Sequence, residues 1–111
     1  MEPAVMVLAL LLLVSLAWVV AGETPGCPLP AKMAAAQVYE NRQVAGITGG
    51  WFGWAEPGPA DVAAALLARR WPDLVHGALY FIGPGDRSRM PWLVERTGRW
   101  ECGGTWAESW R

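Results

Sequence analysis

Metal-binding and basic residues are scarce in this chain. Its only cysteines are Cys27 and Cys102 and its only histidine is His76, a set that does not complete a zinc site, so no metal or cofactor is expected. No lysine or arginine precedes Lys32, and the formal net charge of −1 predicts no general attraction to nucleic acid or anionic lipid. Internal repeats, phosphate-cradling glycine motifs and nucleophile elbows are also missing.

The length of 111 residues suits one domain with a modest core. Apolar residues make up 53% of the chain, and the first 22 positions supply much of this fraction. Eight tryptophans occur, seven of them between Trp51 and Trp110. Because tryptophan buries a large apolar area, a bulky core is favoured over an aromatic-lined groove for sugars.

Residues 4–21 are apolar except for Ser15, and as a helix they would extend roughly 27 Å, close to the thickness of a bilayer core. Three interpretations remain open. The length and the small residues at 19–21 are typical of a cleaved signal peptide, although the positively charged start of such a peptide is missing. An uncleaved membrane anchor would have the same length. A buried first helix of the domain, apolar on all sides, would also give this pattern.

Two further helices are predicted. The first covers about 31–43, with Pro30 near its first turn and Gly46 at its end. The second covers 60 to about 70, with Asp61 near its positive end. Between them, residues 46–54 form a glycine-rich aromatic loop. Glycine lets the backbone approach a ligand closely, and such loops commonly carry binding residues.

Short strands are predicted where aromatic and branched residues are bounded by glycine or proline, at 77–82, 92–94 and 99–102. Thr97-Gly98 is expected to separate the last two strands. Residues 105–111 are expected to form a tail. The order of helices first and then a small antiparallel sheet predicts an α+β fold.

Glu23 is the one carboxylate at the exit of the apolar run, and a turn rich in proline and glycine follows it. A lone carboxylate where an apolar helix meets a cleft suits general acid chemistry, because burial and the negative end of the helix both favour its protonated form. The alternative is that Glu23 is merely the first polar residue after a hydrophobic segment.

Cys27 and Cys102 lie near the two ends of the region that follows the apolar run. A disulfide between them would close a loop of about 75 residues and constrain the unfolded chain by roughly 4 kcal/mol. It would also imply an oxidising compartment. Two unpaired, buried thiols are the alternative that these residues leave open.

Three segments stand in an order found in a known family: 20–24 around Glu23, 34–42 ending in Asn41-Arg42, and 77–81 followed by Pro84. Together they resemble the cell wall hydrolase family of the spore cortex-lytic enzyme, whose domains are similar to lysozyme-type lytic transglycosylases. The stretch 98–102 resembles the closing segment of that family. The resemblance spans roughly residues 16–102.

The sequence departs from the family pattern at three places. Thr24-Pro25 stands in place of Ala-Arg after the glutamate, Gly83 in place of the asparagine before Pro84, and Arg99 where histidine is common. The segment between the second and third motifs matches poorly, so the chain is a divergent copy.

The resemblance implies a small lysozyme-like α+β domain that cleaves the β-1,4 glycosidic bond of peptidoglycan, with Glu23 as the catalytic acid and base. A single-glutamate lytic transglycosylase needs no second carboxylate, and none stands at a helpful sequence position. Trp51, Trp54 and Tyr80 are expected to line the sugar groove, although a core role for each of them is about equally favoured.

The resemblance also bears on residues near the glutamate. Thr24 and Asn41 are expected to be structural residues close to the site. The turn after Glu23 and the closing strand should be neighbours, which favours the Cys27–Cys102 disulfide.

A catalytic Glu23 needs the helix that precedes it, so an uncleaved hydrophobic N-terminus is favoured. The expected organisation is a hydrophobic segment at 1–15 (an anchor or the start of the first helix), a cell wall hydrolase-like domain at 16–104 and the tail at 105–111. The expected partners are peptidoglycan glycan strands, with membrane contact through residues 4–21 and no nucleic acid.

The expected location is extracytoplasmic or membrane-associated, or cytoplasmic until lysis for a phage-encoded form. The alternative function is that of a small non-catalytic binding protein, membrane-anchored or secreted, in which the tryptophans serve as core or as a protein-binding surface.

Overall fold

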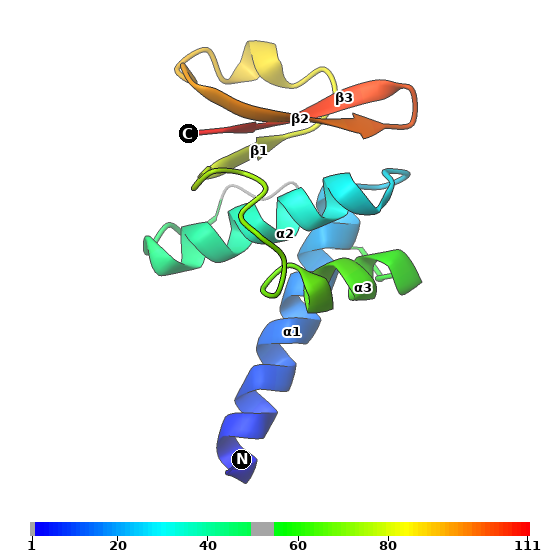
Figure 1. Ribbon diagram of the computed structural model, residues 1–111, viewed down its shortest axis with the longest axis vertical. Coiled ribbons are helices and arrows are strands. Elements are labelled where there is room, and N and C mark those ends of the chain that lie inside the picture. Colours follow the sequence, from blue (N-terminus) through cyan, green and yellow to red (C-terminus); the bar gives the residue numbers. More distant parts are fainter. Residues whose placement is uncertain (1, 50–54) are drawn as a thin grey trace.

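The computed structural model describes residues 2–49 and 55–111, which form three helices followed by a three-stranded antiparallel sheet (Figure 1). The helices are α1 (Pro3–Glu23), α2 (Leu29–Val44) and α3 (Pro59–Leu67). The strands are β1 (Tyr80–Ile82), β2 (Arg96–Cys102) and β3 (Thr105–Trp110), and a short 3-10 helix, η1 (Arg87–Arg89), lies between β1 and β2. The predicted α+β fold with a long apolar first helix is confirmed.

Only the second half of α1 belongs to the domain, and the first half protrudes from it (Figure 1). The buried side chains of α1 all lie near its C-terminus: Leu16, Ala17, Val19, Val20 and Ala21. The helix ends after Glu23 because Thr24 precedes Pro25, which disfavours a helical conformation at that residue. The Thr24 amide and hydroxyl both donate to the Val20 carbonyl, at 2.9 and 2.6 Å, and so complete the last turn.

α2 is the central helix, with α1 and α3 on one side and the sheet on the other (Figure 1). Its alanines allow close packing on both sides: Ala36 belongs to the cluster with α1 and α3, while Ala34 and Ala35 pack with Phe81 of β1 and Ala107 of β3. The predicted bounds of 31–43 are correct to within two residues. Gly46 has a φ of +74°, the left-handed conformation in which glycine commonly follows a helix.

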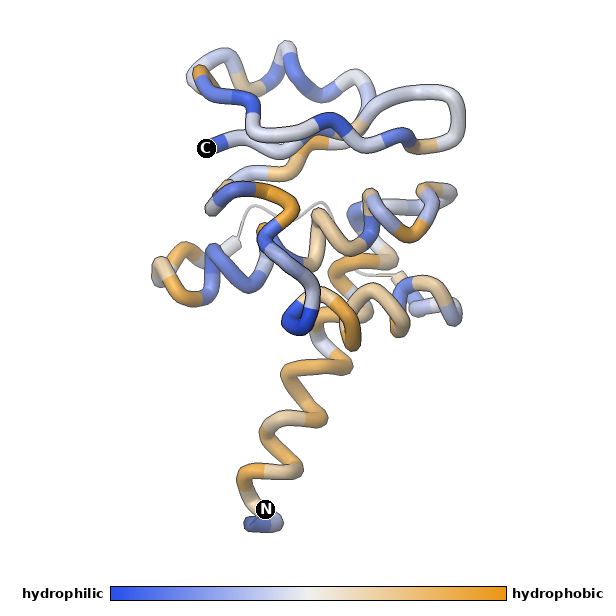
Figure 2. The backbone as a smooth tube through the Cα atoms, in the orientation of Figure 1, coloured by the Kyte–Doolittle hydropathy of each residue, from blue (hydrophilic) through white to orange (hydrophobic). Residues whose placement is uncertain are grey.

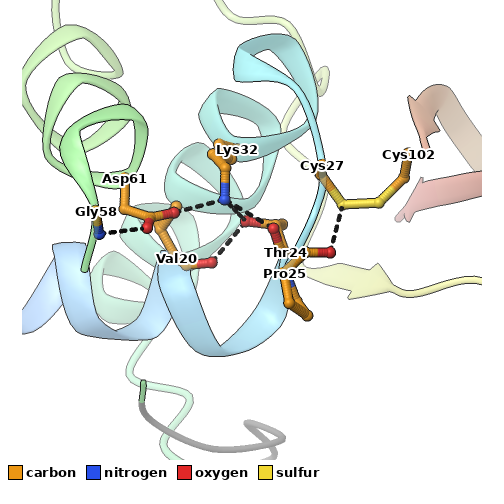
Figure 3. A network of polar contacts seen from close by, with 8 residues as sticks. All are labelled: Val20, Thr24, Pro25, Cys27, Lys32, Gly58, Asp61 and Cys102. Atoms are coloured by element: carbon orange, nitrogen blue, oxygen red, sulfur yellow. Dashed lines mark hydrogen bonds and ion pairs between the residues drawn. A yellow bond between two sulfur atoms is a disulfide. The ribbon is translucent and has the colours of Figure 1, made fainter. Parts of the chain in front are cut away.

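A buried polar network joins the three helices (Figure 3). The Lys32 ammonium on α2 donates to the Thr24 carbonyl at the end of α1, over 2.7 Å, and forms an ion pair of 2.6 Å with Asp61 on α3. The second carboxylate oxygen of Asp61 accepts the Gly58 amide at the start of α3. Lys32 and Asp61 are each only 7% exposed. Because each charge is paired, the network fixes how the helix ends meet below the sheet.

The prediction that residues 105–111 form a tail is wrong, because β3 is the central strand and pairs with both β1 and β2. The reason lies in the side chains on its two faces. The face toward α2 carries the small residues Ala107 and Ser109, both buried, and Ala107 packs with residues of α2. On the other face Trp106 is 49% exposed, and only Trp110 at the end of the strand is buried. The large apolar residues therefore do not mark the face that packs on α2, which is the signal that a strand prediction uses.

The other strands also differ from prediction. No strand forms at 92–94, because the Arg87 guanidinium donates to the Leu93 carbonyl over 2.7 Å and Val94 is 87% exposed. β2 begins at Arg96 and continues through Thr97-Gly98 as a bulge instead of breaking there. At Gly98 an added Cβ would lie 2.9 Å from the Trp100 ring, so glycine lets that ring lie flat on the strand.

The expected core of bulky tryptophans is also wrong for the six tryptophans that the structure describes. Trp110 alone among them is buried, while Trp71, Trp92 and Trp106 are 51%, 62% and 49% exposed. Most of the core consists of alanine and valine, which suits three closely packed helices.

Candidate active site

Glu23 is the last residue of α1 and is half-buried. The hydrogen bonds that the fully buried Thr24 makes to Val20 fix the backbone immediately after it. The Lys32 ammonium on the Thr24 carbonyl places a positive charge against the negative end of α1 and offsets its dipole. The expected structural role of Thr24 therefore has a geometric basis, since Thr24 links Glu23 to the buried network of the helices.

A pocket of about 260 Å³ opens at the C-terminal end of α1, and we call it the Glu23 pocket. Four segments contribute to it: the end of α1, the turn after it, the loop after β1 and the hairpin between β2 and β3. The lining residues are Gly22, Glu23, Pro25, Cys27, Gly83, Pro84, Asp86, Cys102 and Thr105. The predicted catalytic residue thus lies in a concave site, together with Pro84 from the third motif.

The disulfide between Cys27 and Cys102 is present, and its Cα atoms are 4.2 Å apart. It joins the turn after α1 to the end of β2 (Figure 3), as the resemblance implied. Both cysteines line the Glu23 pocket. The alternative of two free thiols is wrong. The covalent bond holds two walls of the pocket together, because the sequence separation of 75 residues would otherwise leave them linked only by packing.

Asp86 is a second carboxylate of the Glu23 pocket that the sequence reasoning missed. Its amide donates to the Gly83 carbonyl in a tight turn, and its carboxylate lies 4.0 Å from the Arg89 guanidinium. The sequence offered one sign of this residue, because an acidic side chain stands two positions after Pro84, in the loop that follows β1. Without the fold, nothing indicated that this loop meets the end of α1.

Asn41 and Arg42 do not line the Glu23 pocket but position the segment that leads to β1. The Asn41 amide donates to the Ala78 carbonyl at 3.0 Å, and the Arg42 guanidinium donates to the Leu79 carbonyl at 2.9 Å. These bonds satisfy carbonyls that precede the strand, so β1 starts at Tyr80 and is shorter than the predicted 77–82. The sequence predicts Asn41 to be a structural residue close to the site. Its side chain holds the segment before β1, but the described lining of the Glu23 pocket does not include it.

The expected aromatic residues are not all placed. Trp51 and Trp54 lie outside the described residues. Tyr80 is half-buried, stacks on the Arg42 guanidinium with 5.6 Å to the ring centroid, and packs beside the cluster of Ile82, Leu93 and Trp110. The described lining of the Glu23 pocket does not include Tyr80.

Glu40 is a second half-buried acid, on the part of α2 that faces α3, and it does not line the Glu23 pocket. Burial raises the pKa of the Glu40 carboxyl, and the Arg69 guanidinium, which donates to it over 3.2 Å, lowers it in part. Its other oxygen has no hydrogen-bond partner among residues 2–49 and 55–111. This environment indicates an acid that is costly to ionise in the folded chain.

We expect Glu40→Gln to remove part of the pH dependence of stability. Because the folded-state pKa of Glu40 lies above its ordinary value of 4.5, ionisation disfavours folding. The free energy of unfolding should therefore rise as the pH falls through the folded-state pKa toward 4.5, and the glutamine variant should lack this rise. Urea titrations across that pH range measure it. Glu95→Gln, an exposed control, should behave like the unmodified chain. The prediction is contradicted if the free energy of unfolding of Glu40→Gln changes with pH in the same way as that of the unmodified chain.

Among the described residues, no three His, Cys, Asp or Glu side chains lie close enough together to hold a metal ion. The described lining of the Glu23 pocket presents two carboxylates, Glu23 and Asp86, beside a disulfide. Comparisons with protein-family models, with curated proteins and with solved structures found no match to this chain.

Proposed function

We propose that the chain is a peptidoglycan-cleaving glycosidase of the lytic transglycosylase or muramidase type, with Glu23 as the general acid and base. One observation carries this proposal. The end of α1 and the loop of Pro84, which resemble separate motifs of the cell wall hydrolase family and lie about 60 positions apart, line the same pocket. If the resemblance were due to chance, these two segments would have no reason to line the same pocket.

The reaction needs one proton donor at the bond that breaks. Glu23 donates its proton to the leaving glycosidic oxygen as the bond to the anomeric carbon breaks. The Glu23 carboxylate then takes a proton from the 6-hydroxyl of the same sugar, whose oxygen attacks the anomeric carbon and closes an anhydro ring. In the muramidase variant, water attacks instead, and a second carboxylate is the usual base or nucleophile. Asp86 is the candidate for that role.

The size of the Glu23 pocket suits a polymeric substrate. Its volume of about 260 Å³ is below the roughly 300–1,000 Å³ of pockets that enclose a drug-sized ligand. A glycan strand would therefore place one sugar in the pocket and continue over the neighbouring surface. Trp51, Trp54 and Tyr80 remain the residues that we propose stack on the sugars.

We expect digestion of purified peptidoglycan to release fragments with anhydro ends, each one water lighter than the hydrolysed product, because one glutamate suffices for that reaction. Mass spectrometry of the soluble fragments distinguishes the two products. Asp86→Asn should still give anhydro ends at a rate within a few-fold of the unmodified chain.

Two results would change this proposal. Hydrolysed ends that disappear in Asp86→Asn would assign a muramidase mechanism with two carboxylates. Binding of the glycan without any fragment release would favour the alternative, a non-catalytic binding protein.

A further inference from the structure

The protruding half of α1 is apolar on all of its sides. Residues 3–15 extend away from the domain (Figure 1), although Leu13 packs against the cluster that joins the three helices, and Figure 2 shows hydrophobic residues along this half up to the hydrophilic tip. No charged side chain occurs between Pro3 and Gly22. Eight large side chains of this half are 47–59% exposed: Val5, Met6, Val7, Leu8, Leu10, Leu11, Leu12 and Val14. An exposed apolar surface of this extent marks an interaction site.

Two cations lie beside α1 where it enters the domain, and a tryptophan follows them in the chain. The chain after α3 carries Arg69, Arg70 and Trp71 in succession, and Trp71 is 51% exposed. Arg69 and Arg70 line a hollow of about 320 Å³, together with apolar residues of the protruding half of α1 and of α3. Arg69 also pairs with Glu40, whereas Arg70 has no ion-pair partner among the described residues.

We propose that this face binds an anionic lipid bilayer, with the exposed part of the protruding half of α1 inserted among the lipids, the exposed Trp71 in the interfacial layer, and Arg69 and Arg70 on the phosphates beside the helix. Tryptophan and arginine beside an apolar helix are the residues that membrane interfaces favour. A helix partner from a second copy would cover one stripe of α1, but lipid covers every side. The small net charge of the chain does not oppose this, because the arginines act locally.

The insertion is partial. Residues 3–15 extend roughly 20 Å, against about 30 Å for the hydrocarbon core, and residues 16–21 are held in the domain by their packing. Membrane contact is expected from the sequence through residues 4–21, and the proposal restricts it to the protruding half of α1. Insertion brings the charged Glu2 at the tip into the hydrocarbon, which costs free energy. Tilt of the helix and thinning of the bilayer lower this free energy.

Removal of residues 1–21 as a signal peptide conflicts with this packing. It would take Leu16, Ala17 and Val20 out of the cluster that joins the three helices. It would also leave Glu23 next to a new chain end.

In the proposed arrangement the bilayer and the Glu23 pocket lie at opposite ends of α1, and Glu23 is about 12 Å along the helix from Ser15.

Flotation of the full chain with vesicles tests the proposal. Vesicles of phosphatidylcholine should carry the chain, and vesicles that also contain phosphatidylglycerol should carry more of it. Arg70→Gln should reduce the preference for the anionic vesicles about fivefold. Arg99→Gln removes the same charge on the sheet and should leave the preference unchanged. Leu11→Glu should reduce binding to both vesicles at least tenfold, whereas Val94→Glu, at an exposed position beside the sheet, should not.

Three outcomes would overturn the proposal. One is a chain that stays with the soluble fraction in both vesicle types. Another is a stable oligomer without vesicles that Leu11→Glu converts to monomer, which would assign the protruding half to a second copy. The third is a mature N-terminus at Gly22 by mass spectrometry, which would identify a cleaved signal. The first two outcomes leave the proposed cleavage of peptidoglycan untouched, so there the two proposals fail separately. A mature N-terminus at Gly22 would overturn both, because it would remove the helix that positions Glu23.

Discussion

Replacing Glu23 with glutamine should lower the rate of peptidoglycan cleavage about 10²–10⁴-fold, the effect expected when a general acid is removed. Glutamine has the shape of glutamate but cannot donate a proton to the leaving oxygen. Because Glu23 is half-buried at the end of α1 and not part of the core, the melting temperature should change little. Turbidity of a suspension of purified peptidoglycan measures the rate.

Two variants serve as controls for that result. Glu40→Gln makes the same chemical change in an acid outside the Glu23 pocket, and its rate should match that of the unmodified chain. Asp86→Asn makes the change inside the pocket and should cost much less than Glu23→Gln for a single-glutamate reaction. If Glu23→Gln retains cleavage within a few-fold, Glu23 is not the general acid.

The second large effect concerns the disulfide. Cys27→Ala with Cys102→Ala should lower the free energy of unfolding by about 4 kcal/mol, because the bond closes a loop with a sequence separation of 75 residues. That is a large part of the roughly 5–15 kcal/mol by which domains are stable. Cleavage should fall as well, since both cysteines line the Glu23 pocket and hold two of its walls together.

Urea unfolding with and without a reductant isolates the contribution of the covalent bond. The reductant should lower the stability of the unmodified chain to near that of the double alanine variant, and should not affect the variant. A reductant-independent difference between the two would instead assign the loss to the packing of Cys27 and Cys102 against Ala31.

The helices could be predicted because their signals are local. Pro30 in the first turn and Gly46 after the end delimit α2, and the proline after Thr24 ends α1. The sheet could not be predicted as well, because the buried face of β3 carries Ala107 and Ser109, and the hydrophobicity of such small residues gives no strand signal. At 92–94 the carbonyl of Leu93 is satisfied by the Arg87 side chain, a contact that no pattern of strand residues reveals.

The candidate site was predictable only in part, for the same reason. Glu23 stands out in the sequence as the first carboxylate after the apolar run, but the ion pair of Lys32 with Asp61 joins residues 29 positions apart on different helices. Asp86 enters the Glu23 pocket through a loop whose position depends on the sheet. Contacts that the tertiary fold creates have no local sequence signature.

The central place of β3 has a consequence for the order of folding. β1 and β2 are not neighbours in the sheet, so neither can pair until β3, the last of the three strands to be synthesised, is available. The three helices and β1 are synthesised earlier, so the helical layer can form while β1 still lacks a partner. During that interval the unpaired strands are open to pairing with other chains. Aggregation during synthesis should therefore increase with the time between the synthesis of the outer strands and that of residues 105–110.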